Sequence, residues 1–154
     1  MKCLFILPLL LTARLSLTGN LRDPDFIDPT GTYLLTGIVK KNHITGHSGE
    51  LRVRLLDRHN AALCFYINKG YPGYESGAFM DTVAYDDNTL CYFPTQDSAC
   101  YLFFSFDPKS VEMIQMYNNP RSGCGFGPGV IVPAVFEKSS NESPVIMDLS
   151  AHGN

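Results

Sequence analysis

Hydrophobic and polar residues alternate along most of this chain, in short runs separated by turn-forming residues. In one clear run, Leu51, Val53 and Leu55 are separated by charged residues, which is typical of a strand with one buried and one solvated face. Residues 57–60 (DRHN) then supply turn chemistry, and the alternation resumes after them. This spacing predicts two antiparallel strands joined by a tight turn.

The same pattern recurs at short intervals and predicts about eight strands. No segment of useful length shows helical periodicity, and connections this short favour antiparallel neighbours. The fold class predicted is therefore all-β, a single antiparallel up-and-down barrel or sandwich in a domain over residues 20–138. Residues 139–154 are polar with isolated apolar positions and predict a flexible C-terminal tail. The expected strands cover 33–39, 51–55, 63–67, 79–85, 90–93, 100–106, 111–117 and 130–136.

The N-terminal segment, residues 1–19, has the pattern of a signal peptide. Lys2 precedes an apolar run of about nine residues, within the range of a secretory signal. A bilayer span needs about 20 apolar residues, so we expect no membrane span from this run. The protein is expected to be periplasmic or secreted.

The net charge and its distribution along the chain limit the kinds of partner that the protein is expected to bind. The 154 residues carry a formal net charge of -3, and from Asn20 onward 10 basic and 15 acidic residues leave -5. There is no basic stripe, so we expect no nucleic-acid partner. An acidic chain favours association with a basic partner. The length also excludes a (β/α)₈ barrel or a two-domain dehydrogenase.

Four cysteines remain beyond the expected signal: Cys64, Cys91, Cys100 and Cys124. An even number in an exported chain predicts two disulfides. Their gaps of 27, 9 and 24 positions lack the close pairs typical of zinc sites, so we expect no metal. Two arrangements fit the spacing: Cys91–Cys100 across a hairpin, or Cys64–Cys91 together with Cys100–Cys124.

No motif for catalysis or a cofactor stands out. His43 and His47 lie four apart, but the glycines and threonine around them disfavour a zinc-binding helix, and solvated loop histidines are expected. Ser76 does not sit in a G-x-S-x-G elbow. Asp81 lies in a strand pattern and is expected to point outward. The sequence therefore predicts a protein that is not an enzyme and has no cofactor.

With no catalytic or cofactor motif, surface recognition is the remaining class of function, and one loop is rich in residues suited to protein binding. The stretch KGYPGYESG contains two tyrosines, which offer large, stiff contact area with a hydrogen-bonding end. The alternative is a turn whose tyrosine rings lie over the end of the barrel. The expected protein-binding residues are Lys69, Tyr71, Tyr74, Glu75 and Ser76.

A C-x-L-x-F-x-F strand, a valine-bearing return strand, C-G-x-G and a final aromatic-x-Lys follow one another over residues 50–138. In this respect the chain resembles small exported bacterial β-proteins, some of which are described as lysozyme inhibitors or lysozyme-inhibitor-like domains. The resemblance implies a β barrel or sandwich, a Cys100–Cys124 bridge and Cys64–Cys91 as a second bridge. The residues that carry it are Cys100, Leu102, Phe104, Phe106, Val111, Cys124, Gly125, Gly127, Phe136 and Lys138.

Inhibitors of C-type lysozyme in this group carry an S-G-x-x-x-Y loop that enters the lysozyme cleft. Ser76-Gly77 matches its start, whereas the aromatic that follows is Phe79 or, further on, Tyr85. We therefore expect an exported binding protein that inhibits a lysozyme-like cell-wall hydrolase or acts as an immunity protein. The alternatives are a barrel that binds a small apolar ligand and a structural protein of the cell envelope.

Overall fold

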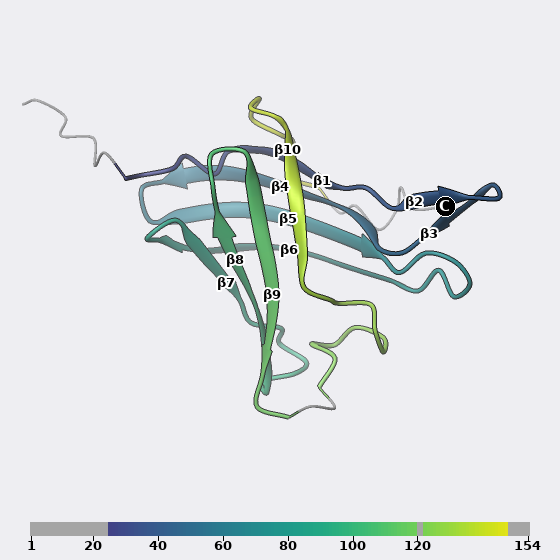
Figure 1. Ribbon diagram of the computed structural model, residues 1–154. Helices are drawn as coiled ribbons and strands as arrows, with labels where there is room; N and C mark the ends of the chain where they lie inside the picture. Colours follow the sequence, from purple (N-terminus) through teal and green to yellow (C-terminus); the bar gives the residue numbers. More distant parts are fainter. Residues whose placement is uncertain (1–24, 120–121, 148–154) are drawn as a thin grey trace, which may run out of the picture.

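Ten strands form the secondary structure of the described residues, 25–119 and 122–147, in the computed structural model (Figure 1). Eight of them close a barrel in the order β1-β10-β9-β8-β7-β6-β5-β4, and every neighbouring pair is antiparallel. This confirms the all-β class and selects the barrel over the sandwich. The expected signal peptide, residues 1–19, lies outside the described residues. The strands are β1 (Gly31–Leu35), β2 (Ile38–Lys40), β3 (His43–Thr45), β4 (Ser48–Asp57), β5 (Asn60–Asn68), β6 (Ser76–Asp86), β7 (Thr89–Tyr92), β8 (Cys100–Phe106), β9 (Ser110–Tyr117) and β10 (Ala134–Ser140).

Tight turns join the barrel strands at one end, as their residue types predict. Between β4 and β5, the Asp57 carboxylate accepts hydrogen bonds from the Asn60 side chain and the His59 backbone N–H. These bonds stabilise the carboxylate and lower its pKa, with the Asn60 side chain as the largest cause. Between β6 and β7, Asp87 and Asn88 adopt φ of 45° and 58°, which is typical of a two-residue hairpin turn.

The barrel interior is filled by its own aromatic side chains. Inward-facing residues of β8 are buried at every second position, which is the alternation seen in the sequence. The ring of Phe65 on β5 lies 5.9 Å from the ring centroids of both Phe104 on β8 and Phe136 on β10. Because these strands lie on different sides of the barrel, the rings meet across its axis.

One disulfide, Cys100–Cys124, ties the start of β8 to the long connection between β9 and β10. The Cα atoms are 5.1 Å apart and 24 positions separate the residues. Cys124 has φ of 54°, and Gly125 after it has φ of 78°, a region that glycine enters freely. The bridge implied by the resemblance is therefore confirmed.

The second expected bridge, Cys64–Cys91, is wrong, because both cysteines are free thiols. Cys64 lies on β5 and Cys91 on β7, with β6 between them. Two strand spacings amount to about 10 Å, beyond the reach of a disulfide. Burial raises the pKa of each thiol, so each stays protonated at neutral pH.

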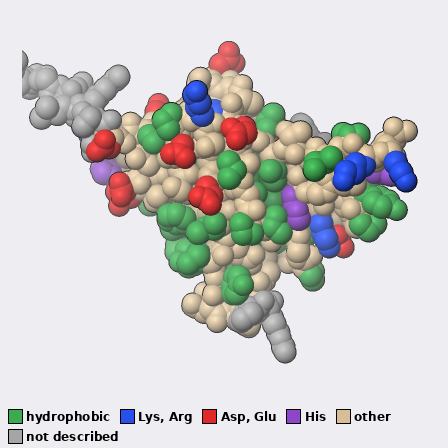
Figure 2. Space-filling model, in the orientation of Figure 1, with side chains coloured by type: hydrophobic (Ala, Val, Ile, Leu, Met, Phe, Trp, Pro, Cys, Tyr) green, Lys and Arg blue, Asp and Glu red, His purple; other side chains and the backbone are tan. Residues whose placement is uncertain are grey.

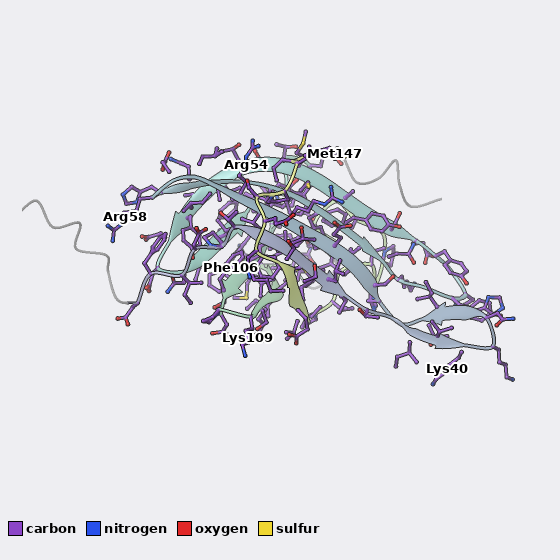
Figure 3. All side chains as sticks on the ribbon, turned by 90° about the horizontal axis from the view of Figure 1, so that it is seen from above. Lys40, Arg54, Arg58, Phe106, Lys109 and Met147 are labelled. Carbon is purple, nitrogen blue, oxygen red and sulfur yellow. A yellow bond between two sulfur atoms is a disulfide. The ribbon has the colours of Figure 1, made fainter. Side chains whose placement is uncertain are left out.

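The last strand runs two residues past the expected domain limit at Lys138, into the segment predicted to be a tail. β10 continues to Ser140, where the Ser139 hydroxyl donates to the Thr32 backbone oxygen on β1. Beyond it, the backbone of Met147 forms a hydrogen bond with the Cys64 thiol and lies against the outside of the barrel (Figure 3). This contact explains why Cys64 is fully buried although its neighbours on β5 point inward. Residues 148–154 lie outside the described part of the chain.

Two strands have limits that differ from those expected from the sequence. The strand expected over 33–39 is two strands, β1 and β2, interrupted at Thr36-Gly37, and the chain returns through β3 as a hairpin. A Cβ atom at Gly37 would lie 2.6 Å from the Ile44 side chain, so a larger residue there would displace Ile44. The last strand begins at Ala134 rather than at Val130. Within the described ranges, no helix is long and apolar enough to cross a membrane.

Candidate functional site

The two ends of the barrel differ in the length of their connections. One end has the tight turns after β4, β6 and β8, whereas the other carries the four long connections, over residues 36–47, 69–75, 93–99 and 118–133. Long surface loops held on a rigid scaffold are where binding residues concentrate. The long-loop end is therefore the part of the barrel best suited to carry a binding site.

The most prominent feature of that end is a projection, which we call the tip and define as residues 38–45 and 69–76. The β2–β3 hairpin extends away from the barrel, and the loop between β5 and β6 runs beside it (Figure 1). The Tyr71 backbone N–H donates to the Ile44 carbonyl at 2.8 Å, and Tyr71 forms a parallel bridge with Thr45. The loop thus adds a short third strand to the hairpin.

Aromatic side chains bind the two parts of the tip together. The His43 ring stacks on Tyr71 with centroids 4.7 Å apart, and the Tyr74 hydroxyl lies 3.3 Å from His43 Nδ1. Tyr71 and Tyr74 also meet edge to face at 6.2 Å. The tyrosine rings therefore pack on the hairpin, rather than over the barrel core.

The loop is held in one conformation by its own hydrogen bonds. The Lys69 backbone N–H donates to the Glu75 carbonyl at 2.9 Å, and the Asn68 side chain donates to the Tyr74 carbonyl at 3.0 Å. Gly70 has φ of 76°, and a Cβ atom there would lie 2.4 Å from the Gly46 carbonyl oxygen. A loop ordered before binding loses less conformational entropy when it binds.

The charged residues expected in the site serve mainly to join loops. Lys69 Nζ lies 3.4 Å from the Glu75 carboxylate and donates to the Pro128 carbonyl at 3.3 Å. His47 Nε2 lies 2.8 Å from the Gly129 carbonyl oxygen. The long connection between β9 and β10 is therefore attached to the base of the tip. Ser76 is exposed at the first position of β6, next to the barrel.

Sequence reasoning did not identify the apolar residues of the hairpin. Ile38 is 62% exposed and Val39 is 72% exposed, and because they are consecutive on a strand they point to opposite faces. Tyr71 is 51% exposed and Tyr74 is 46% exposed beside them. The available signal was the polar pair Lys41-Asn42 between short apolar stretches, and its positive φ values make the hairpin turn.

Charge is distributed unevenly between the two ends. The tip carries three lysines, Lys40, Lys41 and Lys69, against Glu75 alone. The turn end carries several aspartates, and Figure 2 shows blue side chains at the hairpin and red ones toward the opposite end. In Figure 3, Lys40 and Arg58 mark these two ends of the molecule. The tip is thus a basic pole on an acidic protein.

The buried titratable groups have structural partners. The hydroxyls of Tyr33 and Tyr85 donate to the backbone carbonyls of Pro29 and Ile27, and burial raises the pKa of both phenols. In the described residues, no cluster of three or more His, Cys, Asp or Glu is arranged to hold a metal.

The arrangement of the tip is suited to surface recognition. No family model, no curated protein and no solved structure matches the chain.

Proposed function

We propose that this chain is an exported binding protein that uses its tip to occupy the cleft of a partner, a cell-wall hydrolase of the lysozyme class. The observation that carries the proposal is the pre-organised hairpin with exposed apolar side chains on both faces. A flat partner surface could cover one face of such a hairpin, whereas the two walls of a cleft cover both. The Cys100–Cys124 disulfide supports export, because such bonds persist in oxidising compartments.

The charges of the tip fit the same partner. Lys40 and Lys41 lie at the end of the hairpin, where they would reach deepest into a cleft. Glycoside hydrolases place two carboxyl groups beside the bond they cleave, so the base of such a cleft is acidic. The acidic remainder of the chain would steer it toward a basic enzyme during approach. An immunity protein against a rival's hydrolase would use the same geometry.

The proposal is tested by inhibition of purified lysozymes. We expect the protein to slow hydrolysis of cell-wall substrate and to form a complex measurable by calorimetry. The double substitution Tyr71→Ala with Tyr74→Ala should weaken binding by at least about tenfold, since aromatic anchors contribute most of the energy of such interfaces. Tyr117→Ala is the matched control, because Tyr117 is 50% exposed but lies on β9.

Two outcomes would count against the proposal. One is the absence of any complex with C-type, goose-type or invertebrate-type lysozyme at micromolar concentration. The other is equal binding by the tip variant and the Tyr117 variant. A small apolar ligand inside the barrel is less well supported, because the Phe65 ring meets Phe104 and Phe136 across the axis. Native mass spectrometry of the purified protein would detect such a ligand as added mass.

A further inference from the structure

The end of the barrel opposite the tip is strongly acidic. Counting only residues that the structure describes, the turns and the lead-in at this end carry six aspartates against two basic residues, Arg58 and Lys109. Both exposed ends of the molecule therefore carry a local charge, and the two charges have opposite sign. The aspartates are Asp25, Asp28, Asp57, Asp86, Asp87 and Asp107.

A pocket of about 220 Å³ lies at this acidic end, between the lead-in and the turns after β4 and β6. Its aromatic wall is formed by Phe26 and Tyr85, whose rings meet edge to face with centroids 5.8 Å apart. Asp86 and Asp87 form part of its rim and are exposed. Arg58 also lines the pocket, and its guanidinium carbon lies 5.7 Å from the Phe26 ring centroid. The pocket thus combines an aromatic wall with more carboxylates than cations, and none of these residues takes part in the tip.

We propose that the tip of one copy of this chain binds the turn-end pocket of a second copy, head to tail. Lys40 and Lys41 of the tip meet Asp86 and Asp87 of the pocket, and Val39 beside the lysines contacts the part of the Phe26 ring that Arg58 leaves exposed. A second copy is the occupant because the chain itself supplies both complementary surfaces. The contact joins two different surfaces, so each copy still has one free end and the assembly grows with concentration.

The first test is sedimentation velocity of the protein purified after export, over a range of concentration and salt. We expect larger species at low salt and high concentration. They should disappear at about 0.5 M salt, where charges separated by more than a few ångströms are screened. Lys41→Glu should weaken association about tenfold, since it replaces an attraction with a repulsion. Arg54→Glu is the matched control, because it makes the same charge change at an exposed site on β4.

The second test separates the two surfaces by mixing variants. Lys40→Glu with Lys41→Glu disables the tip, and Asp86→Asn with Asp87→Asn disables the pocket while keeping residues that suit a hairpin turn. Each variant alone should be monomeric, whereas the mixture should give a 1:1 dimer and nothing larger. The matched control for the pocket variant is Glu112→Gln with Glu137→Gln, at exposed positions on β9 and β10, and it should associate like the parent.

Several outcomes would overturn the inference. These are a protein that stays monomeric at every concentration and salt, association that survives both double variants, or mixed variants that form no dimer. A tip that binds a lysozyme, or vesicles containing phosphatidylglycerol, but never its own copy would also overturn it. Because lysozyme binding is measured separately with the pocket variant, failure of self-association leaves the proposed function intact, and the reverse also holds.

Discussion

Replacing Phe65 with alanine tests the central claim that aromatic rings fill the barrel. Phe65 is fully buried, and its ring lies 5.1 Å from Phe79 in addition to the two rings across the axis. Removing a buried phenylalanine ring costs about 3–5 kcal/mol through lost transfer energy and the cavity left behind. A domain of this size has a free energy of unfolding of about 6–18 kcal/mol. The substitution should therefore remove a large share of the stability.

The assay is urea unfolding followed by far-UV circular dichroism, because the sequence contains no tryptophan to report fluorescence. The control is Phe93→Ala, which deletes the same atoms from a side chain that is 63% exposed, and it should cost less than about 1 kcal/mol. Equal losses in the two variants, or a loss below about 1 kcal/mol for Phe65→Ala, would refute the filled interior. That result would also restore the case for a ligand cavity.

Three other predictions follow from the packing and the thiols. Replacing Cys100 and Cys124 with serine should lower the free energy of unfolding by about 3.5 kcal/mol, the loop-closure value for a separation of 24 positions, and dithiothreitol should lower the parent to match. Under native conditions iodoacetamide should label Cys91 but not the buried Cys64, and removing the residues after β10 should make Cys64 reactive. Labelling is measured by mass spectrometry. Equal labelling of both thiols in the full chain would contradict the burial of Cys64. Because Tyr33 and Tyr85 have a raised pKa in the folded state, stability is fully present below pH 10 and falls as the pH rises above it. There the unfolded chain ionises first. Urea midpoints of Tyr85→Phe should decline less steeply between pH 9 and pH 11 than those of the parent.

The fold was largely predictable because strand burial follows a local pattern. Alternation in β4, β5 and β8 depends only on which side of the sheet each residue faces, so a single sequence contains it. Barrel closure is different, because the pairing of β1 with β10 joins segments about 100 positions apart. The limits of the last strand also depended on non-local pairing with β9, which local composition does not encode.

The site was predictable only in part. The tyrosine-rich loop could be selected by composition, but the stacking of Tyr71 on His43 links two loops that are distant in sequence. The prediction of a Cys64–Cys91 disulfide failed for a related reason. An even number of cysteines carries no information about the strand that separates Cys64 from Cys91. Likewise, the polar sequence of the tail gave no sign that Met147 would cover Cys64.

Closure of the barrel has a consequence for how this protein avoids aggregation. Each described strand of the barrel has a partner on both sides, which leaves little free backbone edge in the main sheet. The ladder between β6 and β7 is the weakest, because it is limited to Tyr85 and Asp86 of β6. Among the described strands, β2 also has an exposed edge, because it pairs with β3 alone. Lysines on an edge strand oppose the addition of a foreign strand. Lys40 on this edge and Lys41 in the turn beside it therefore oppose extension of the hairpin sheet, and neutral substitutions there would favour fibril formation as well as weaken the proposed binding.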